Sequence, residues 1–231
     1  MQYIQEFKIM IEAVVLMEEN KKGTVIVLSG FSGAGKGTIM KHLLSTYPDK
    51  YFLSVSATTR EKRTGEEDGR EYFFLSMEKF EDMIKNHELL EYASFNRNYY
   101  GTPKAYVEKL VNEGKDVILE IEVQGALQIR KIFPQAILLF VTPPDAATLK
   151  RRLEGRGTED AEVVAERLSI AGRESLLMEQ YDYIIVNDDL NEAVEKVHNI
   201  IQSEKNSSIK KSDFISRIQS ELSQFSKGET K

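Results

Sequence analysis

The residues with the clearest chemical pattern lie at positions 25–38, where the sequence reads VIVLSGFSGAGKGT. The apolar, mostly β-branched residues 25–28 predict a buried strand, and a helical pattern begins after Lys36. Three glycines in the connecting loop let the backbone take positive φ angles and approach an anion closely. The loop N–H groups and the positive end of the next helix would face a polyphosphate, and Lys36 would add a charge for its outer phosphates. This pattern is typical of a phosphate-binding P-loop.

One position departs from the P-loop pattern. The pattern G-x-x-x-x-G-K-[ST] has a hydroxyl after the lysine, whereas this chain has Gly37 followed by Thr38. Residue 37 therefore offers no hydroxyl for direct ligation of Mg²⁺, and the metal would keep more water. The variant G-K-G-T resembles nucleoside monophosphate kinases of the adenylate type. That resemblance favours a ligand-binding loop over a glycine-rich turn without a ligand.

A second apolar run, at residues 117–122, contains two acids at its end, Glu120 and Glu122. If the run is one strand, alternation places both carboxylates on the same side. A buried strand that delivers a carboxylate beside a P-loop suits Mg²⁺, which binds oxygen ligands or waters that carboxylates hold. The alternative is an edge strand with both acids in solvent, which so apolar a strand disfavours.

Two arginines three residues apart, Arg60 and Arg63, follow several hydroxyl residues. Guanidinium groups bind phosphate oxygens through two parallel hydrogen bonds, so the pair predicts a second anion site. A loop with solvated charges explains the two arginines equally well. Tyr72, Tyr99 and Tyr100 fit either a packed aromatic patch or hydroxyls that help to hold a phosphate.

Arginines also gather after a third apolar run, at residues 136–141. Asp145 predicts the N-cap of a helix that runs to Leu153. Glycines on both sides of residue 156 indicate a hinge among cations, typical of a lid that closes on phosphates. A solvated charged surface is the alternative. The arginines of this segment are Arg151, Arg152, Arg156, Arg167 and Arg173.

Composition limits the class of protein. The 231 residues are 41% hydrophobic, which is enough for one domain with a full core. The absence of cysteine excludes disulfides and thiol chemistry, and a net charge of −6 argues against a broad nucleic-acid surface. No apolar run is long enough to span a bilayer, and the N-terminal residues lack the pattern of a signal peptide. We expect a cytoplasmic protein that acts on neither membranes nor nucleic acids.

Four apolar runs alternate with helical patterns along the chain. This alternation predicts an α/β fold with a parallel sheet that helices cover on both faces. The four runs are residues 25–28, 117–122, 136–141 and 183–186.

The segment between the first two runs predicts a helix at residues 78–92 and a hairpin from residues 91–95 and 98–103, followed by a helix at 104–112. The two ends of the chain are different in character. Residues 1–22 predict an amphipathic helix that packs on the core or on a second subunit, with Met17 as an alternative natural start. Residues 203–231 predict a tail with one short amphipathic helix, attached weakly.

Five stretches of the chain resemble the guanylate kinase family, whose members phosphorylate GMP with ATP. The resemblance covers residues 23–202. Each stretch alone is moderate evidence, but five in the family's order make coincidence implausible. They are SVSATTREKRTGEEDGREY (54–72), EYASFNRNYYGT (91–102), LEIEVQGA (119–126), RLEGRGTE (152–159) and IVNDDL (185–190).

The resemblance implies a P-loop NTPase core at residues 23–54, 106–146 and 175–202. It also implies a small mixed α/β GMP-binding subdomain at residues 55–105 and a helical lid at 147–174.

The resemblance also implies a GMP site. Guanine presents donors at N1 and at its amino group, which suit the acceptor-only carboxylates Glu91 and Glu122, whereas adenine has an acceptor at N1. Many family members have aspartate where this chain has Glu122, and the extra methylene could shift affinity without changing the reaction. The implied residues are Ser56, Glu91, Thr102 and Glu122 for the base and Arg60, Arg63, Tyr72 and Tyr100 for the phosphate.

An ATP site and catalytic groups follow from the same resemblance. Lys36, Arg152, Arg156 and Arg167 would neutralise charge on the transferring phosphoryl group. Glu120 would hold Mg²⁺, through water. The implied ATP-binding residues are Gly30, Phe31, Ser32, Gly33, Ala34, Gly35, Lys36, Gly37, Thr38 and Asn187, the last near the adenine.

The implied reaction of purine nucleotide metabolism is ATP + GMP = ADP + GDP, by in-line transfer while a closed lid excludes water. Tolerance of dGMP and assembly into a homo-oligomer stay open. One alternative is a kinase for another small phosphate acceptor, which Glu91 and Glu122 disfavour. Another is a non-catalytic guanylate-kinase-like binding module, which the intact Lys36 and lid arginines disfavour.

Overall fold

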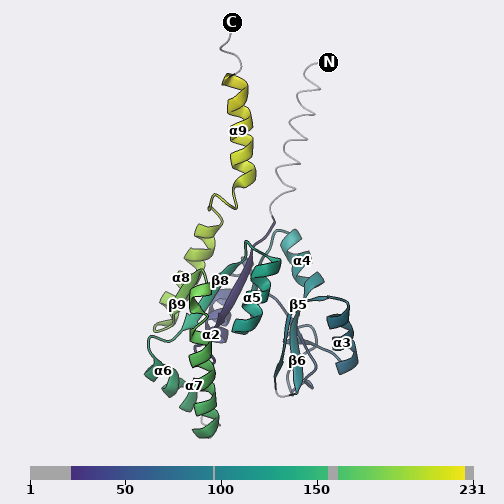
Figure 1. Ribbon diagram of the computed structural model, residues 1–231, viewed down its shortest axis with the longest axis vertical. Helices are drawn as coiled ribbons and strands as arrows, with labels where there is room; N and C mark the ends of the chain where they lie inside the picture. Colours follow the sequence, from purple (N-terminus) through teal and green to yellow (C-terminus); the bar gives the residue numbers. More distant parts are fainter. Residues whose placement is uncertain (1–21, 96, 156–160, 227–231) are drawn as a thin grey trace. The chain divides into compact units, whose positions relative to one another are not determined.

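The computed structural model describes residues 22–95, 97–155 and 161–226 (Figure 1). The predicted N-terminal helix, apart from Lys22, and the predicted lid arginine Arg156 lie outside these residues. The strands are β1 (Val25–Gly30), β2 (Tyr51–Leu53), β3 (Ser56–Thr58), β4 (Tyr72–Phe74), β5 (Leu89–Phe95), β6 (Asn98–Pro103), β7 (Asp116–Glu120), β8 (Ile137–Thr142) and β9 (Tyr183–Val186). The helices are α2 (Lys36–Thr46), α3 (Met77–Lys85), α4 (Lys104–Asn112), α5 (Val123–Ile132), α6 (Ala146–Glu154), α7 (Ala161–Ser175), the 3₁₀ turn η1 (Met178–Gln180), α8 (Leu190–Glu204) and α9 (Ser212–Ser226).

A five-stranded sheet has the strand order β2-β7-β1-β8-β9. Strand β1 pairs with β8, β8 with β9, and β2 with β7, and each of these pairs is parallel. In β8, the side chains of Leu138, Leu139 and Phe140 have no exposed surface. Such a continuous apolar run is expected for a parallel strand covered on both faces. The predicted α/β fold, with helices flanking a parallel sheet, is confirmed.

The chain divides into two compact units. Of the described residues, one unit combines Ile26–Tyr47 with 120–155 and 161–226, and it contains the glycine loop, α2 and the helices α5 to α9. The other unit combines the described residues 22–25, 48–95 and 97–119, and it contains a small sheet of order β4-β3-β6-β5. In this small sheet β3 is parallel to β4, whereas β6 is antiparallel to both β3 and β5.

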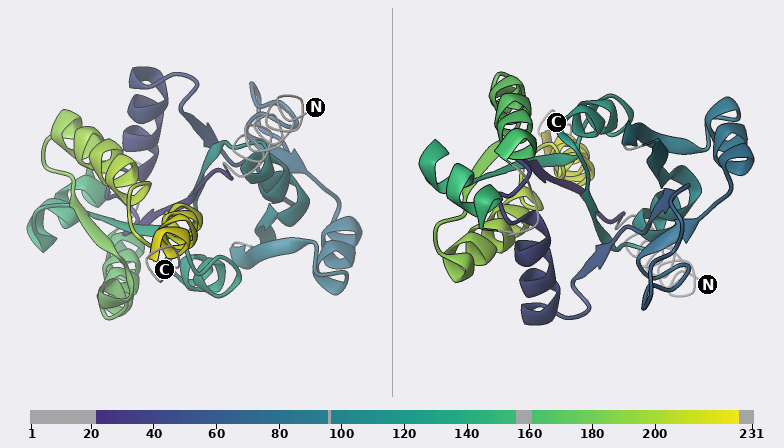
Figure 2. Two further views of the ribbon diagram at one scale, coloured as in Figure 1. Left: turned by 90° about the horizontal axis from the view of Figure 1, so that it is seen from above. Right: turned by 90° about the horizontal axis from the view of Figure 1, so that it is seen from below.

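Local signals account for several helices of the first unit. The Asp145 carboxylate accepts a hydrogen bond of 2.6 Å from the backbone N–H of Thr148, so the predicted N-cap of α6 is confirmed. Helices α2 and α8 lie side by side (Figure 2), and the rings of Tyr47 and His198 stack with centroids 3.8 Å apart. This packing supports the helix whose first turn follows the glycine loop.

Two predicted elements are wrong. Helix α3 ends at Lys85 rather than at residue 92, because His87 takes the left-handed conformation (φ 56°) and β5 begins at Leu89. Residues 117–122 are not one strand: β7 ends at Glu120, and Glu122 is the N-cap residue of α5, with φ −71° and ψ 160°. The inference that both acids lie on one side of a strand therefore does not hold.

Other predicted elements are confirmed. Strands β5 and β6 form the expected hairpin, helix α4 has the predicted bounds, and β9 covers residues 183–186. Helix α9 is the short amphipathic helix of the tail, with Leu222 at 61% and Phe225 at 76% exposure. Of the helices in the described ranges, none has the length and apolar character that crossing a membrane requires.

Candidate functional site

The glycine loop joins the end of β1 to the start of α2 and contains a glycine in the left-handed conformation at the helix N-cap. Gly35 has a φ of 93°, and a Cβ there would lie 2.4 Å from the side-chain nitrogen of Asn187. Gly30 has a φ of 136°, and a Cβ there would lie 2.0 Å from the carbonyl oxygen of Val141. No side chain caps α2 at Gly35. The N–H groups of its first turn are therefore oriented toward the space where an anion is expected.

The side chains of the loop divide into structural and exposed ones. Phe31 is buried with its ring centroid 4.9 Å from that of Phe140, and Ala34 is buried as well. These two residues hold the loop and offer only their backbone to a ligand. Ser32, Gly37 and Thr38 are exposed on the loop and the first turn of α2.

The side chain of Lys36, at the end of the glycine loop, reaches back to the start of the same loop. Its Nζ donates hydrogen bonds to the carbonyl oxygens of Gly30, at 2.7 Å, and Phe31, at 3.2 Å. The carboxylate of Glu120 lies beside the same turn, because a Cβ on Gly37 would be 3.6 Å from Glu120 Oε1. Burial raises the pKa of Glu120, the Lys36 ammonium opposes that shift, and Glu122 adds to it. A cation therefore favours the ionised form of this carboxylate.

Asn187 and Arg152 both bind the loop through the carbonyl oxygen of Ala34. The buried Asn187 donates to it from Nδ2 at 2.8 Å, and Arg152 donates from Nη1 at 3.4 Å. Arg152 also donates from Nη2 to the backbone oxygen of Asn187 at 2.9 Å. The three residues form a latch that fixes the loop against α6 and the end of β9.

Helix α7 presents a second predicted arginine. Arg167 is half-buried on the face of α7 that also carries the buried residues Val164 and Ala171. Glu174, two turns beyond Arg167, continues this face, and the sequence reasoning missed it. Burial raises the pKa of Glu174 to about 7, the charge of Glu122 adds to the shift, and the Lys36 ammonium opposes it. The helical spacing of residues 164, 167, 171 and 174 is the signal that could have found Glu174.

The remaining arginines of the segment interact locally. Arg151 donates to the hydroxyl of Thr148 at 2.8 Å, and Arg173 donates to the hydroxyl of Ser169 at 3.1 Å. The sequence reasoning assigned neither of them to the site.

In the other unit, Arg60 lies beside aromatic rings of β4. Its guanidinium carbon is 5.5 Å from the ring centroid of Tyr72 and 5.7 Å from that of Phe74. The rings of Tyr72 and Tyr100 meet edge to face, with centroids 5.9 Å apart. The structure therefore brings together three of the four residues predicted to hold a phosphate. The fourth, Arg63, has an exposed side chain on the same loop.

The hairpin of the small sheet contains a buried polar pair. Thr102 is fully buried and donates from its hydroxyl to Glu91 Oε1 at 2.6 Å, and Glu91 is 6% exposed. Ser56 lies on β3 of the same sheet and is half-buried. Glu122 belongs to the other unit and is exposed. The small unit therefore holds three of the four predicted base-reading residues.

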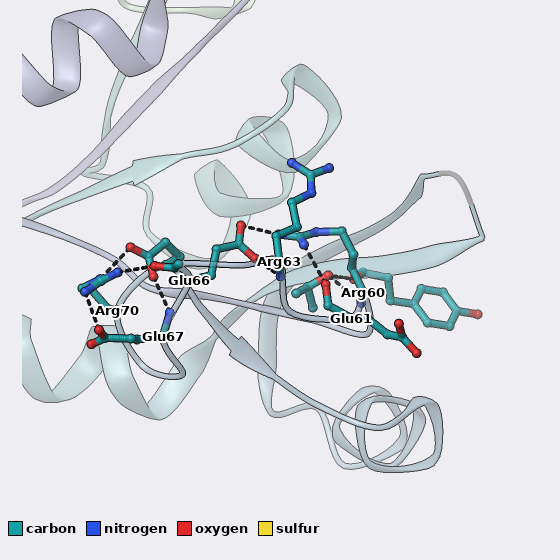
Figure 3. Close-up of polar contacts among 10 residues, drawn as sticks. Arg60, Glu61, Arg63, Glu66, Glu67 and Arg70 are labelled. Atoms are coloured by element: carbon teal, nitrogen blue, oxygen red, sulfur yellow. Dashed lines mark hydrogen bonds and ion pairs between the residues drawn. The ribbon is translucent and has the colours of Figure 1, made fainter.

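The arginine loop contains a carboxylate that the sequence reasoning did not assign. Glu66 accepts a hydrogen bond of 2.8 Å from Arg60 Nη2 (Figure 3). No periodic pattern marks Glu66, because the contact depends on the fold of the loop. Among the residues that the structure describes, no three His, Cys, Asp or Glu side chains gather closely enough to hold a metal ion by themselves.

Comparison with known proteins agrees with this geometry. The family model described as "Guanylate kinase" matches residues 22–204. A guanylate kinase of Streptococcus thermophilus (strain CNRZ 1066) is 51% identical over 185 residues, covering 80% of this chain and 88% of the relative. One of Bacillus anthracis is 50% identical over 185 residues, covering 80% and 90%. The crystal structure of guanylate kinase from Anaplasma phagocytophilum matches with a TM-score of 0.65 at 32% identity, covering 81% of this chain and 88% of that one.

Proposed function

The chain belongs to the guanylate kinase family, and we propose that it transfers the γ-phosphoryl group of ATP to the phosphate of GMP, giving ADP and GDP. The observation that carries the choice of acceptor is the buried Glu91 carboxylate. Thr102 uses its hydroxyl to bind one oxygen of Glu91. An ionised carboxylate accepts hydrogen bonds only, so it matches the N1–H and amino donors of guanine.

The glycine loop is the proposed site of the ATP phosphates. In the structure Lys36 donates to two loop carbonyls. When ATP binds, its charged phosphate oxygens would take the place of these neutral acceptors. The latch of Asn187 and Arg152 keeps the loop carbonyl of Ala34 occupied, so the loop is preorganised before ATP arrives. We also assign Asn187 to the border of the adenine site.

Arg60, Tyr72 and Tyr100 form the proposed site of the GMP phosphate, with Arg63 at its edge. The aromatic rings beside Arg60 limit its hydration, which strengthens its attraction for a phosphate. Ser56 and Thr102 are the other residues of this unit that we propose to read the base, and we propose the same role for Glu122 of the other unit.

The proposed chemistry is an in-line displacement. An oxygen of the GMP phosphate attacks the γ-phosphorus while the bond to the bridging oxygen of ADP breaks, and no covalent protein intermediate forms. Lys36, Arg152, Arg156 and Arg167 are the proposed groups that neutralise charge on the equatorial oxygens. Positioning and electrostatic stabilisation supply the rate enhancement.

The residues near the loop fit Mg²⁺ when the nucleotide supplies most of its ligands. Glu120 is a single carboxylate beside Gly37 and the charge of Lys36, and Mg²⁺ in such sites keeps several waters. We propose that Glu120 binds one of these waters. When bound, the metal would offset the negative charge of the phosphates.

The proposal extends to the setting of the protein. A net charge of −6 supports small nucleotides rather than nucleic acid as its substrates. We propose a cytoplasmic location, where both nucleotides are available.

The direct test is identification of the products. The full chain is incubated with ATP, Mg²⁺ and GMP, and the nucleotides are separated by ion-exchange chromatography. We expect GDP and ADP to form in equal amounts, and neither to form when GMP is omitted. Nucleotide binding without any product would instead support the non-catalytic binding module.

A further inference from the structure

The acidic side chain of Glu66 joins the two predicted phosphate-binding arginines within one loop (Figure 3). Its Oε1 accepts a hydrogen bond from Arg60 Nη2 at 2.8 Å, and its Oε2 accepts one from the backbone N–H of Arg63 at 2.9 Å. A single carboxylate therefore binds the guanidinium of one arginine and the backbone of the other.

A tight turn brings Glu66 into this position. The N–H of Glu66 donates to the carbonyl of Arg63 at 3.1 Å, and Gly65 between them has a φ of 89°, which favours glycine. The hydrogen bond from the backbone of Arg63 to Oε2 holds the carboxylate of Glu66 in place independently of Arg60. The other carboxylate oxygen, Oε1, can therefore orient the guanidinium of Arg60.

This ion pair differs from its neighbour on the same loop. The side chains of Arg60 and Glu66 are 14% and 18% exposed, whereas those of Arg70 and Glu67 are 53% and 67% exposed. Water screens the exposed pair, so that pair contributes little. Hydrogen bonding to Arg60 lowers the pKa of Glu66, which favours the ionised carboxylate that pairs with the guanidinium.

Arg60 keeps donors for a ligand while Glu66 holds it. A guanidinium has five N–H donors. One of Nη2 goes to Glu66, one of Nη1 goes to the carbonyl oxygen of Glu61 at 2.7 Å, and the side chain of Tyr100 is a further hydrogen-bond partner of Arg60. The ring of Tyr72 lies against the guanidinium of Arg60 and reduces the number of rotamers that the Arg60 side chain can adopt. The rotamer is therefore set before a phosphate binds.

We propose that Glu66 is a positioning residue for the phosphate acceptor, which holds Arg60 in the orientation that binds the phosphate of GMP. This inference rests on the proposed function. Without Glu66 the arginine must lose rotamer freedom when GMP binds, which weakens GMP binding but leaves the ATP site unchanged.

The test compares Glu66→Ala with Glu67→Ala, a matched control that removes the same charge from the exposed pair. Steady-state kinetics should show KM for GMP about tenfold higher in Glu66→Ala, with kcat and KM for ATP within about twofold of wild type. The control should stay within about twofold in every constant. Thermal unfolding of each variant establishes that it is folded.

A double-mutant cycle shows whether Glu66 acts through Arg60. In the Arg60→Ala background, Glu66→Ala should raise KM for GMP no further. An equal rise in both backgrounds would overturn the proposal, since Glu66 would then act independently of Arg60. A lower KM in Glu66→Ala would also overturn it, because Glu66 would then compete with phosphate. Wild type without GMP turnover would overturn the proposed function, whereas normal turnover with an unchanged KM in Glu66→Ala would overturn only the role of Glu66.

Discussion

Replacing Glu91 by glutamine tests how the protein would recognise guanine. Glu91 is 6% exposed, and Thr102 donates to its Oε1 at 2.6 Å. Glutamine has the same shape and keeps a carbonyl oxygen that can accept from Thr102, so we expect the free energy of unfolding to change by less than about 1 kcal/mol. The substitution therefore changes the group proposed to read the base more than it changes the fold.

The expected loss follows from the charged hydrogen bond. A hydrogen bond to an ionised group contributes about 1.5–3 kcal/mol, and about 1.4 kcal/mol is a tenfold change. We therefore expect kcat/KM for GMP to fall about 10- to 100-fold in Glu91→Gln. The new amide N–H₂ faces a donor on guanine but an acceptor on adenine, so the ratio of kcat/KM for GMP to that for AMP should fall further than the value for GMP alone.

A coupled assay of ADP release with GMP and AMP measures both constants. Glu88→Gln is the matched control, because Glu88 is exposed just before the same hairpin and should leave both constants unchanged. The reasoning is refuted if folded Glu91→Gln keeps the wild-type preference for GMP over AMP.

Four further substitutions test the unit that contains the glycine loop. Lys36→Ala should lower kcat about 10²- to 10³-fold with little change in KM for GMP, measured by steady-state kinetics. Gly35→Ala should lower the free energy of unfolding by more than about 1 kcal/mol, because its φ is 93° and a Cβ would lie 2.4 Å from Asn187. Gly37→Ala should leave the free energy of unfolding unchanged or raise it by up to about 1 kcal/mol. Denaturant titration measures both glycine variants, and an equal loss of stability in Gly35→Ala and Gly37→Ala would contradict this reasoning. Burial raises the pKa of Glu174 to about 7 from 4.5. The native state therefore holds a proton that the unfolded chain has lost, and the free energy of unfolding falls as pH rises from about 4.5 to 7. Solvent screening reduces the effect to about 1–2 kcal/mol. Glu174→Gln should flatten this pH dependence, and an unchanged profile would show that the carboxyl is not perturbed.

The sequence was sufficient for the parts of the fold that depend on local pattern. Apolar runs without polar interruption marked β1, β8 and β9, and Asp145 marked the start of α6, because both signals act over a few neighbouring residues. The hairpin of β5 and β6 was also predicted, with the helix that follows it.

The two wrong elements share a physical cause. The left-handed His87 ends α3, although histidine is not the glycine that usually marks such a position. The apolar character of residues 117–123 continues past the end of β7, so the periodicity did not show that α5 begins after Glu122. In both cases the sequence lacked a glycine or proline at the boundary.

The sequence predicted the parts of the candidate site that belong to a local motif. It did not predict the parts that depend on contacts between residues that the fold brings together. The glycine loop and Lys36 were found from spacing alone. Glu66 and Glu174 were missed, since the first depends on how a turn closes onto Arg60 and the second on which face of α7 is buried. The latch between Arg152, Asn187 and the carbonyl of Ala34 joins residues that are far apart in sequence, and no local pattern specifies it.

The measurement that tests the central claim most directly is the acceptor profile of the wild-type chain. ADP production from ATP and Mg²⁺ is compared with GMP, dGMP, AMP, UMP and no acceptor. We expect kcat/KM for GMP to exceed that for AMP by about 10⁴-fold or more, because a buried acceptor left unpaired against the wrong base is costly. Equal or greater turnover with AMP or UMP would contradict the assignment of Glu91 to guanine recognition, and no turnover with any acceptor would contradict the proposed reaction.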